Sequence, residues 1–496
     1  MRKIFIAIVV ILFPFSFAHS QQIEVESAIR NSQNIYQGSA RFMGMGGAFT
    51  ALGGDISSIS VNPAGVGVYT GMQFVFTPSF QAQDVASTTP YRGSSFDEDA
   101  LNYKVNLNNM GLMASYNLRG SVGWKNINIG LGYNTLHSFD QKVEGSAFNL
   151  DQSKLHEFVS NANQGRWGDA YEELAWQTYL MNYDSTYAEY WSFVTDEMNF
   201  SDTTAMDEVG VNQRQTITNG GNLGEYFIAA GANYNNKLYV GLSLGIQRYK
   251  FTYKSTYTES EVNNQIPDYS GMNFIQHEDH SGTGYNFKIG AIYRPVDFVR
   301  IGAAFHSPTY FSNLEYGWYN QMTGNYDNGD NLTSQSEEST FSYKLTTPSK
   351  LIGGVAFKIA DMGMISADYE RLDYGNARLS EKEEDVPFNY ENDSIQSTYG
   401  VANNLRLGGE LKLNSFYVRL GYALYESPYR DTYSDYQSKR IMYSGGLGYR
   451  EKGFFVDVTY LTSSYSTEER ILSTIPGFSE VDFNNNRIIF TAGIRF

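Results

Sequence analysis

The segment 487–496 alternates residue by residue between two kinds of side chain. One face is wholly apolar, and the other carries arginine, threonine, glycine and one isoleucine; the apolar face comprises Ile488, Phe490, Ala492, Ile494 and Phe496. A period of two is that of a β-strand, and about ten residues are what a tilted strand needs to cross a lipid bilayer. The segment therefore predicts a membrane-crossing β-strand that ends on a phenylalanine.

The same alternation recurs in fourteen candidate strands. They begin near residues 70, 105, 124, 223, 237, 284, 298, 348, 362, 405, 415, 441, 453 and 487. Tight turns alternate with long connections, which we place at roughly 84–103, 141–222, 258–283, 310–347, 372–404, 426–440 and 464–486. Short periplasmic turns and long outer loops are typical of membrane barrels. The pattern predicts an all-β fold, a transmembrane antiparallel β-barrel of about 14 strands.

Composition narrows the functional classes. The 496 residues include 47 Gly, 39 Tyr and no Cys, and the formal net charge is −17. A chain without cysteine forms no disulfides, Cys-zinc sites or thiol nucleophiles. An acidic chain lacks the basic face that neutralises phosphates, so we expect no nucleic-acid partner. The mean hydropathy of −0.38 excludes a helical membrane protein.

The N-terminus indicates export. Arg2 and Lys3 precede an apolar run to Phe17, and small residues follow up to Ser20. A basic start, an apolar centre and a small-residue cleavage site predict a signal peptide at 1–20. We expect a hatch at 21–68 and the barrel at 69–496, whose 141–222 loop lies outside the cell. These features predict the bacterial outer membrane, with its lipid, lipopolysaccharide and barrel assembly machinery, which reads terminal strands like that of Phe496, as partners.

Residues 21–68 lack strand alternation and are rich in glycine. Their motifs are the run Gly38–Phe49, which contains Gly44, Gly46 and Gly47, then Asp55, then Asn62, Pro63, Ala64 and Gly65. Glycine lets backbones approach closely, and Asn-Pro favours a turn, so the segment suits threading inside a barrel. Placed just after a signal peptide, these motifs resemble the start of the FadL/OmpP1/TodX family of outer-membrane transporters for hydrophobic compounds.

The resemblance implies a fourteen-stranded barrel, plugged by an N-terminal hatch, that passes long-chain fatty acids or aromatic hydrocarbons by diffusion. It assigns the hatch turn to Asn62, Pro63 and Ala64, and we expect Gly44, Gly46 and Gly47 to form the gate beside it. It also implies capture in an outer-loop groove, a lumenal pocket and sideways release near the third strand, where Gly130 and Gly132 would permit a kink. An accessory FadL-like barrel of a secretion machine, a haem-uptake protein and a general porin stay open as alternatives.

The 141–222 loop carries helical patterning and many aromatic residues, including Trp176. Leu155, Phe158 and Val159 share one helical face. Two interpretations stay open. The loop either forms a small core on the barrel rim or presents an apolar groove to a hydrophobic ligand, for which Trp176 is a candidate contact.

Several charged residues fall on the lumen side of the predicted strands. Arg300, His306, Arg406 and Arg419 are candidates for ligand contact, although the arginines could instead pair with lumenal Asp368, Glu370, Glu410 and Asp457. We predict no enzyme, no catalytic residue, no metal and no cofactor. The sequence 277–280, His-Glu-Asp-His, leaves a metal- or haem-binding loop open, but it lacks the metalloprotease spacing.

The fifth predicted strand changes its apolar face. Apolar residues take even positions from Leu238 to Ile246 and odd positions from Tyr249 to Tyr253. Either a bulge shifts the register, or the upper strand leaves the bilayer and turns Arg248, Lys250 and Lys254 toward lipopolysaccharide phosphates.

Overall fold

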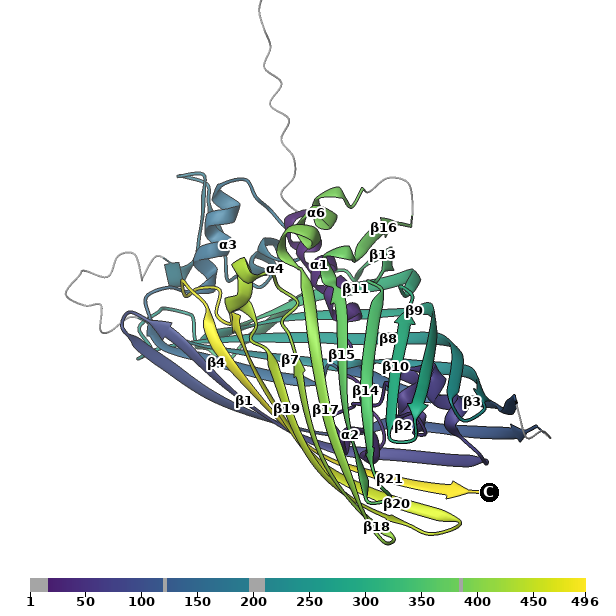
Figure 1. Cartoon of the computed structure of the whole chain (residues 1–496). Helices are drawn as coiled ribbons and strands as arrows, with labels where there is room; N and C mark the ends of the chain where they lie inside the picture. The colour runs from purple at the N-terminus through teal and green to yellow at the C-terminus, as the bar shows by residue number, and fades with distance from the viewer. Residues whose placement is uncertain (1–16, 119–122, 196–209, 383–386) are drawn as a thin grey trace, which may run out of the picture.

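The computed structural model describes residues 17–118, 123–195, 210–382 and 387–496. Its main feature is a closed antiparallel barrel of fourteen strands, in which β21 pairs with β1 (Figure 1). The predicted fold class and strand number are confirmed. In chain order the wall is formed by β1 (Gln73–Tyr91), β2 (Ser94–Asn117), β3 (Trp124–Ser138), β7 (Val211–Tyr234), β8 (Leu238–Glu261), β9 (Gly271–Val296), β10 (Val299–His306) with β11 (Tyr310–Asn325), β13 (Ser339–Thr346) with β14 (Lys350–Ile359), β15 (Gly363–Asp373) with β16 (Arg378–Glu381), β17 (Val401–Leu413), β18 (Phe416–Tyr425), β19 (Arg440–Arg450), β20 (Phe454–Glu469) and β21 (Ser479–Arg495).

The outer face of the wall is apolar where the strands cross the membrane. Leu244, Ile289 and Leu420 are exposed on it, while the side chains between them point inward. Lipid on one side and a polar lumen on the other explain the alternation. A closed barrel with an apolar outer face is the architecture of a bacterial outer-membrane protein. In the described part of the chain, no helix is long and apolar enough to span a membrane.

The strands extend far beyond the bilayer on the outer side, which corrects two of the predicted loops. β7 and β8 have 24 residues each and β9 has 26, more than twice what a crossing needs. The predicted loop 84–103 is a hairpin, because β1 and β2 are joined through Arg92 and Gly93, both with positive φ. The predicted loop 141–222 is shortened, since β4 (Gln141–Leu150) pairs with the first part of β7. The inward face of the first hairpin mixes Val85 with Ser87 and Thr89, so it is buried but shows no apolar alternation.

The change of face in β8 is an exit from the bilayer and not a bulge. β8 pairs with β7 and β9 along its length without a register shift. Tyr249 and Phe251 are buried inside the barrel, whereas Arg248 and Lys250 are exposed. Between the two alternatives, the structure therefore favours the exit.

The long outer loop forms a small core on the rim. It contains α3 (Lys154–Asn163), α4 (Glu172–Gln177), β5 (Asn182–Asp184) and β6 (Glu189–Trp191). Leu155 and Phe158 are buried against Tyr257 and Phe274 of the wall extensions. Burial lowers the pKa of the His156 imidazole, which keeps it neutral as the capping partner of Ser153. The rim-core interpretation of this loop fits these contacts.

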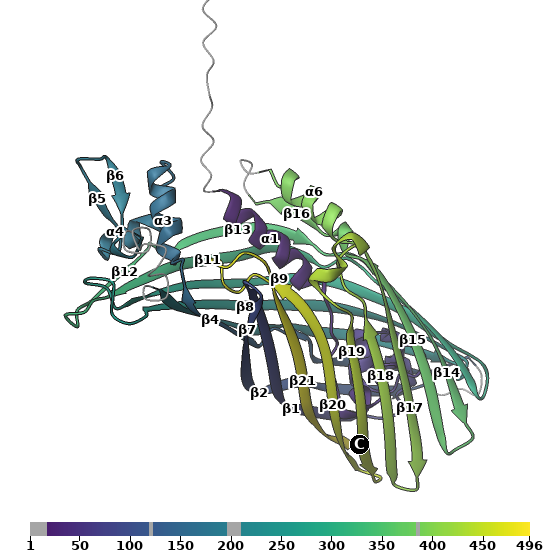
Figure 2. The same cartoon turned by 90° about the vertical axis from the view of Figure 1, so that its left-hand side faces the viewer.

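The N-terminal segment enters the barrel from the outer mouth. The helix α1 (Phe17–Ser32) lies beside α6 (Asn389–Thr398) above the strands, and the chain then descends to α2 (Ala40–Gly44), η1 (Ile56–Ser60) and η2 (Pro63–Val68) before β1 (Figures 1 and 2). We call residues 33–72 the plug; nearly every residue from 36 to 67 is buried. The predicted signal peptide at 1–20 lies outside the described residues except for the first turn of α1.

The remaining short elements lie in the outer loops. The strand β12 (Asn331–Gln335) pairs with β11. The single turns η3 (Tyr374–Asn376) and η4 (Asp431–Tyr436) complete the assignment.

Candidate functional site

The plug contacts the wall on two opposite sides. On one side, η2 packs against β3, β7, β8 and β9; on the other, α2 packs against β18, β19, β20 and β21. The lumen at this level is therefore filled with protein, and the site is best described as the plug and the lumenal surface around it.

Backbone contacts dominate the η2 side. Asn62 caps η2: its Oδ1 accepts from Ala64 N at 3.0 Å, and its Nδ2 donates to Thr50 O at 2.7 Å and to Ala291 O of the wall at 3.2 Å. Pro63 occupies the first helical position, where its missing N–H is no loss. The predicted hatch-turn residues therefore lie together against the wall.

A belt of glycines on the inner wall makes this approach possible. We call it the glycine belt; paired across neighbouring strands, its members are Gly231, Gly241 and Gly290, then Gly302 and Gly354, then Gly408 and Gly421. A Cβ added to Gly241 would overlap Pro63 O, and one added to Gly290 would overlap Asn62. Any larger side chain there would push the plug away. The sequence analysis missed the belt, although inward glycines on adjacent strands were a signal for it.

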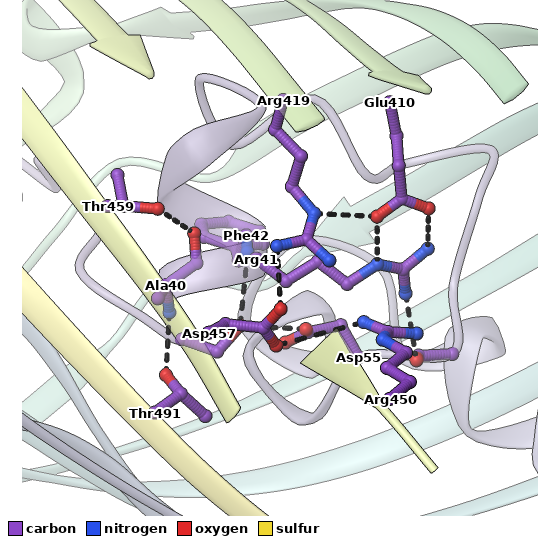
Figure 3. Close-up of polar contacts among 12 residues, drawn as sticks. Ala40, Arg41, Phe42, Asp55, Glu410, Arg419, Arg450, Asp457, Thr459 and Thr491 are labelled. Atoms are coloured by element: carbon purple, nitrogen blue, oxygen red, sulfur yellow. Dashed lines mark hydrogen bonds and ion pairs between the residues drawn. The ribbon is translucent and has the colours of Figure 1, made fainter. Parts of the chain in front are cut away.

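Charged groups hold the α2 side (Figure 3). Arg41 donates from Nε and Nη2 to Glu410 at 2.9 and 3.0 Å, and Arg419 donates to Glu410 at 2.7 Å and to Asp457 at 2.7 Å. Arg450 lies 3.8 Å from Asp457. We call these five residues the charge lattice. Because the lattice is buried, an arginine in it would be an unpaired buried charge without these two carboxylates.

The start of α2 is held by hydroxyl groups of the wall. Ala40 N donates to Thr491 Oγ1 at 2.7 Å, and Thr459 Oγ1 donates to Ala40 O at 2.5 Å (Figure 3). Gly44, at the last position of the helix, leaves room for Thr459. These bonds satisfy backbone groups that a short buried helix cannot satisfy itself.

Gly46 and Gly47 form the turn after α2. Their φ angles are +61° and +76°, which L side chains rarely adopt. A Cβ on Gly46 would also lie 2.6 Å from Tyr422 O and 2.8 Å from Leu407 O of the wall. The turn therefore requires glycine for both its conformation and its packing.

The predicted ligand contacts on the wall all face the lumen. Arg300 donates to Leu52 O of the plug at 2.8 Å, and the His306 ring lies 2.9 Å from Val61 O. Arg406 pairs with Glu370 at 3.0 Å, and Arg419 belongs to the charge lattice. The structure thus brings these side chains to the plug and to wall carboxylates, and their contact with a ligand stays a prediction. Arg41, a plug residue without any periodic pattern around it, escaped the sequence analysis.

Aromatic side chains line the outer half of the lumen. Phe139, Tyr249, Phe251 and Tyr316 form part of a continuous buried cluster that also contains Ile29 of α1. Arg30 of α1 lies 3.6 Å from the centre of the Phe251 ring. We call this region the aromatic lining. It is an apolar surface inside the barrel, filled by the first helix of the chain itself.

The other predicted contact, Trp176, lies far from this lining in α4. Its side chain is 41% exposed, and its ring meets Tyr190 within the rim core. His277 and His280 lie three residues apart on β9, one at an odd and one at an even position, so their side chains point to opposite faces of the strand. This separation argues against a shared metal between the two histidines.

The backbone ladder between the second and third strands ends partway along the wall. The β2–β3 ladder runs from Asn117 paired with Asn126 up to Asn109 paired with Asn134, and the β3–β7 register shifts between Thr135 and His137. We call this region the seam. Gln37 N of the plug donates to Thr135 O there at 3.2 Å. The ladder is regular at Gly130 and Gly132, and the shift in the β3–β7 register begins three residues beyond Gly132, so a kink at these glycines stays a prediction.

Comparisons with known proteins agree with this architecture. No family model and no curated protein matches the chain. Among solved structures, a Pseudomonas aeruginosa FadL homologue matches with a TM-score of 0.55 and 12% identity over 94% of this chain and 100% of that chain. The Pseudomonas putida toluene transporter TodX matches with a TM-score of 0.51 and 12% identity over 92% of this chain and 98% of that chain. The resemblance expected from the sequence is therefore confirmed at the level of the fold.

Proposed function

We propose that the protein is an outer-membrane channel that admits hydrophobic small molecules by diffusion through a plugged barrel. The aromatic lining is the observation that carries this proposal, because it offers an apolar surface inside the outer mouth. The face of α1 that fills it, which includes Val25, Ala28 and Ile29, shows that apolar groups are accepted there. The toluene-transporting neighbour supports the same class of cargo, either aromatic hydrocarbons or fatty acids.

The proposed route has two steps. Cargo first replaces α1 against the aromatic lining, and the plug then shifts away from the wall. The seam is the proposed place of sideways release for uncharged cargo, since the strand ladder is already open there and Gln37 of the plug is bonded to it. The turn at Gly46 and Gly47 gives the plug its freedom to move. The proposed activity is transport and not catalysis.

Conductance and uptake test this proposal together. A fourteen-stranded barrel is wide enough to leak if it is empty, so wild type in planar bilayers should conduct few ions and a deletion of 38–65 should conduct strongly. Gly46→Val with Gly47→Val should lower the uptake of a hydrophobic dye into proteoliposomes. Gly353→Val is the matched control, because a Cβ at that position meets open space. Open-porin conductance of wild type, or normal uptake by the double variant, would contradict the proposal.

A further inference from the structure

A cavity lies at the periplasmic end, beneath the plug. Its volume is about 690 Å³, within the range of small-molecule sites. The plug contributes Arg41, Leu52–Gly54 and Val68–Met72 to its lining, and the ends of β1, β9, β10, β14, β15 and β21 contribute the rest. We call it the basal cavity. The route described above does not use it.

The basal cavity is strongly basic in an acidic protein. Its charged lining residues are Arg41, Arg294, Arg300, Lys358 and Arg495, and none of its lining side chains is a carboxylate. The chain as a whole has 53 acidic and only 36 basic residues. An excess of cationic side chains against that average concentrates positive potential in a concave site.

Two of these arginines have uncharged partners. Arg41, Arg294 and Lys358 pair with Glu410, Asp297 and Asp361, none of which lines the cavity. Among the described residues, Arg300 bonds to the Leu52 carbonyl at 2.8 Å, and Arg495 lies 5.0 Å from the centre of the Phe455 ring. Both guanidinium groups can therefore accept an anion without losing an ion pair.

Apolar side chains share the same cavity. Leu52, Val68, Met72, Ala356 and Met364 lie among the cations. A free inorganic anion would gain nothing from them, and a plain hydrocarbon would gain nothing from the guanidinium groups. We infer that the basal cavity binds an amphiphilic anion, with its head at Arg300 and Arg495 and its tail on the apolar side chains.

This inference rests on the proposed function and sharpens its cargo. An anionic head that leaves sideways through the seam enters hydrocarbon, where an isolated charge is costly. The basal cavity offers the head a cationic site that opens to the periplasm. Arg41 also links the cavity to the charge lattice, since it donates to Gly54 O on one side and to Glu410 on the other. A bound anion competes with Glu410 for Arg41, so occupancy loosens the plug.

The absence of cysteine makes the cavity easy to probe. An environment-sensitive dye on Met72→Cys reports occupancy in purified protein, titrated with hexadecanoate or with hexadecanol. Arg300→Gln with Arg495→Gln should weaken hexadecanoate binding about tenfold or more, because charge-assisted bonds are lost, and should leave hexadecanol unchanged. Arg371→Gln, an exposed arginine bonded to Asn403 at 3.1 Å, is the control and should change neither.

The outcomes separate the inference from the proposed function. Unchanged hexadecanoate affinity in the double variant, or an equal loss for hexadecanol, overturns the anion site. Equal competition by inorganic phosphate or by phosphatidylglycerol assigns the cavity to a free anion or a lipid headgroup and overturns the cargo assignment. If wild type admits the neutral dye in the uptake assay, the proposed function stands even when the anion site fails. If it admits none, the proposed function fails.

Discussion

Different kinds of interaction hold the two sides of the plug. On the α2 side, the charge lattice places three arginines and two carboxylates in buried contact. On the η2 side, the plug backbone lies against Gly231, Gly241 and Gly290 of the glycine belt, and Asn62 of the plug with Asn126 and Asn128 of β3 forms neutral hydrogen bonds between plug and wall. The first side is held mainly by charge pairing, and the second by close backbone packing and neutral hydrogen bonds.

This difference suggests how a plug can be both tight and movable. A buried ion pair costs a great deal when one partner is removed, but little when an alternative partner arrives. The η2 backbone rests on glycines and is held by neutral hydrogen bonds, so no buried ion pair has to separate when it moves. We therefore expect that the contacts on the α2 side must break before the plug moves, and that the η2 side can then slide along the wall.

Removal of the shared carboxylate should have the largest effect. Glu410→Ala leaves Arg41 buried without its partner and removes one of two partners from Arg419, at a cost of about 3–5 kcal/mol. Hydrogen–deuterium exchange of residues 40–47 should rise more than about a hundredfold, while exchange of residues 62–68 rises far less. Glu315→Ala, at an exposed carboxylate of β11, is the control. Equal acceleration on both sides would show that the plug is one rigid body.

A side chain in the glycine belt should have the next largest effect, and on the opposite side. Gly241→Val overlaps the plug at Pro63, and overpacking of this kind costs about 1–3 kcal/mol. Exchange of residues 62–68 should rise between about fivefold and a hundredfold, with residues 40–47 nearly unchanged. Gly353→Val faces open space and should change neither segment. Faster exchange at α2 alone would contradict the assignment of the two sides.

Removal of a single neutral hydrogen bond on the α2 side should have the smallest effect on exchange. Thr459→Val keeps the shape of the side chain and removes its bond to Ala40 O, worth about 0.5–1.5 kcal/mol. Exchange around α2 should rise between about twofold and tenfold. An effect as large as that of Glu410→Ala would mean that hydroxyl bonds, not charges, hold this side.

The wall could be predicted from the sequence because lipid imposes alternation. Strands such as β21 show one apolar face, and the count of fourteen followed from such faces. The same rule failed above the membrane. The inward residues of β1 in this region, Val85, Ser87 and Thr89, are buried but mix apolar and polar types, so the pairing of β1 with β2 left no periodic signal.

The interior could be predicted less well, because its contacts join distant residues. The glycines of the plug were recognised, but the belt that receives them depends on register between strands, as in Gly241 paired with Gly231 and Gly290. The pairing of lumenal arginines with Glu370, Glu410 and Asp457 was among the expected alternatives. The pairing of Arg41 with Glu410 was not expected, because no local sequence pattern marks Arg41.

A reversible disulfide between plug and wall tests most directly the central claim that the plug must move for cargo to pass. Gly44 lies against Thr459, with an added Cβ 2.8 Å from its Oγ1, and the chain has no cysteine of its own. Gly44→Cys with Thr459→Cys should form a disulfide, and uptake of the hydrophobic dye into proteoliposomes is then measured before and after reduction. The account predicts little uptake when oxidised and near wild-type uptake when reduced. Equal uptake in both states would contradict a plug that must move for cargo to pass.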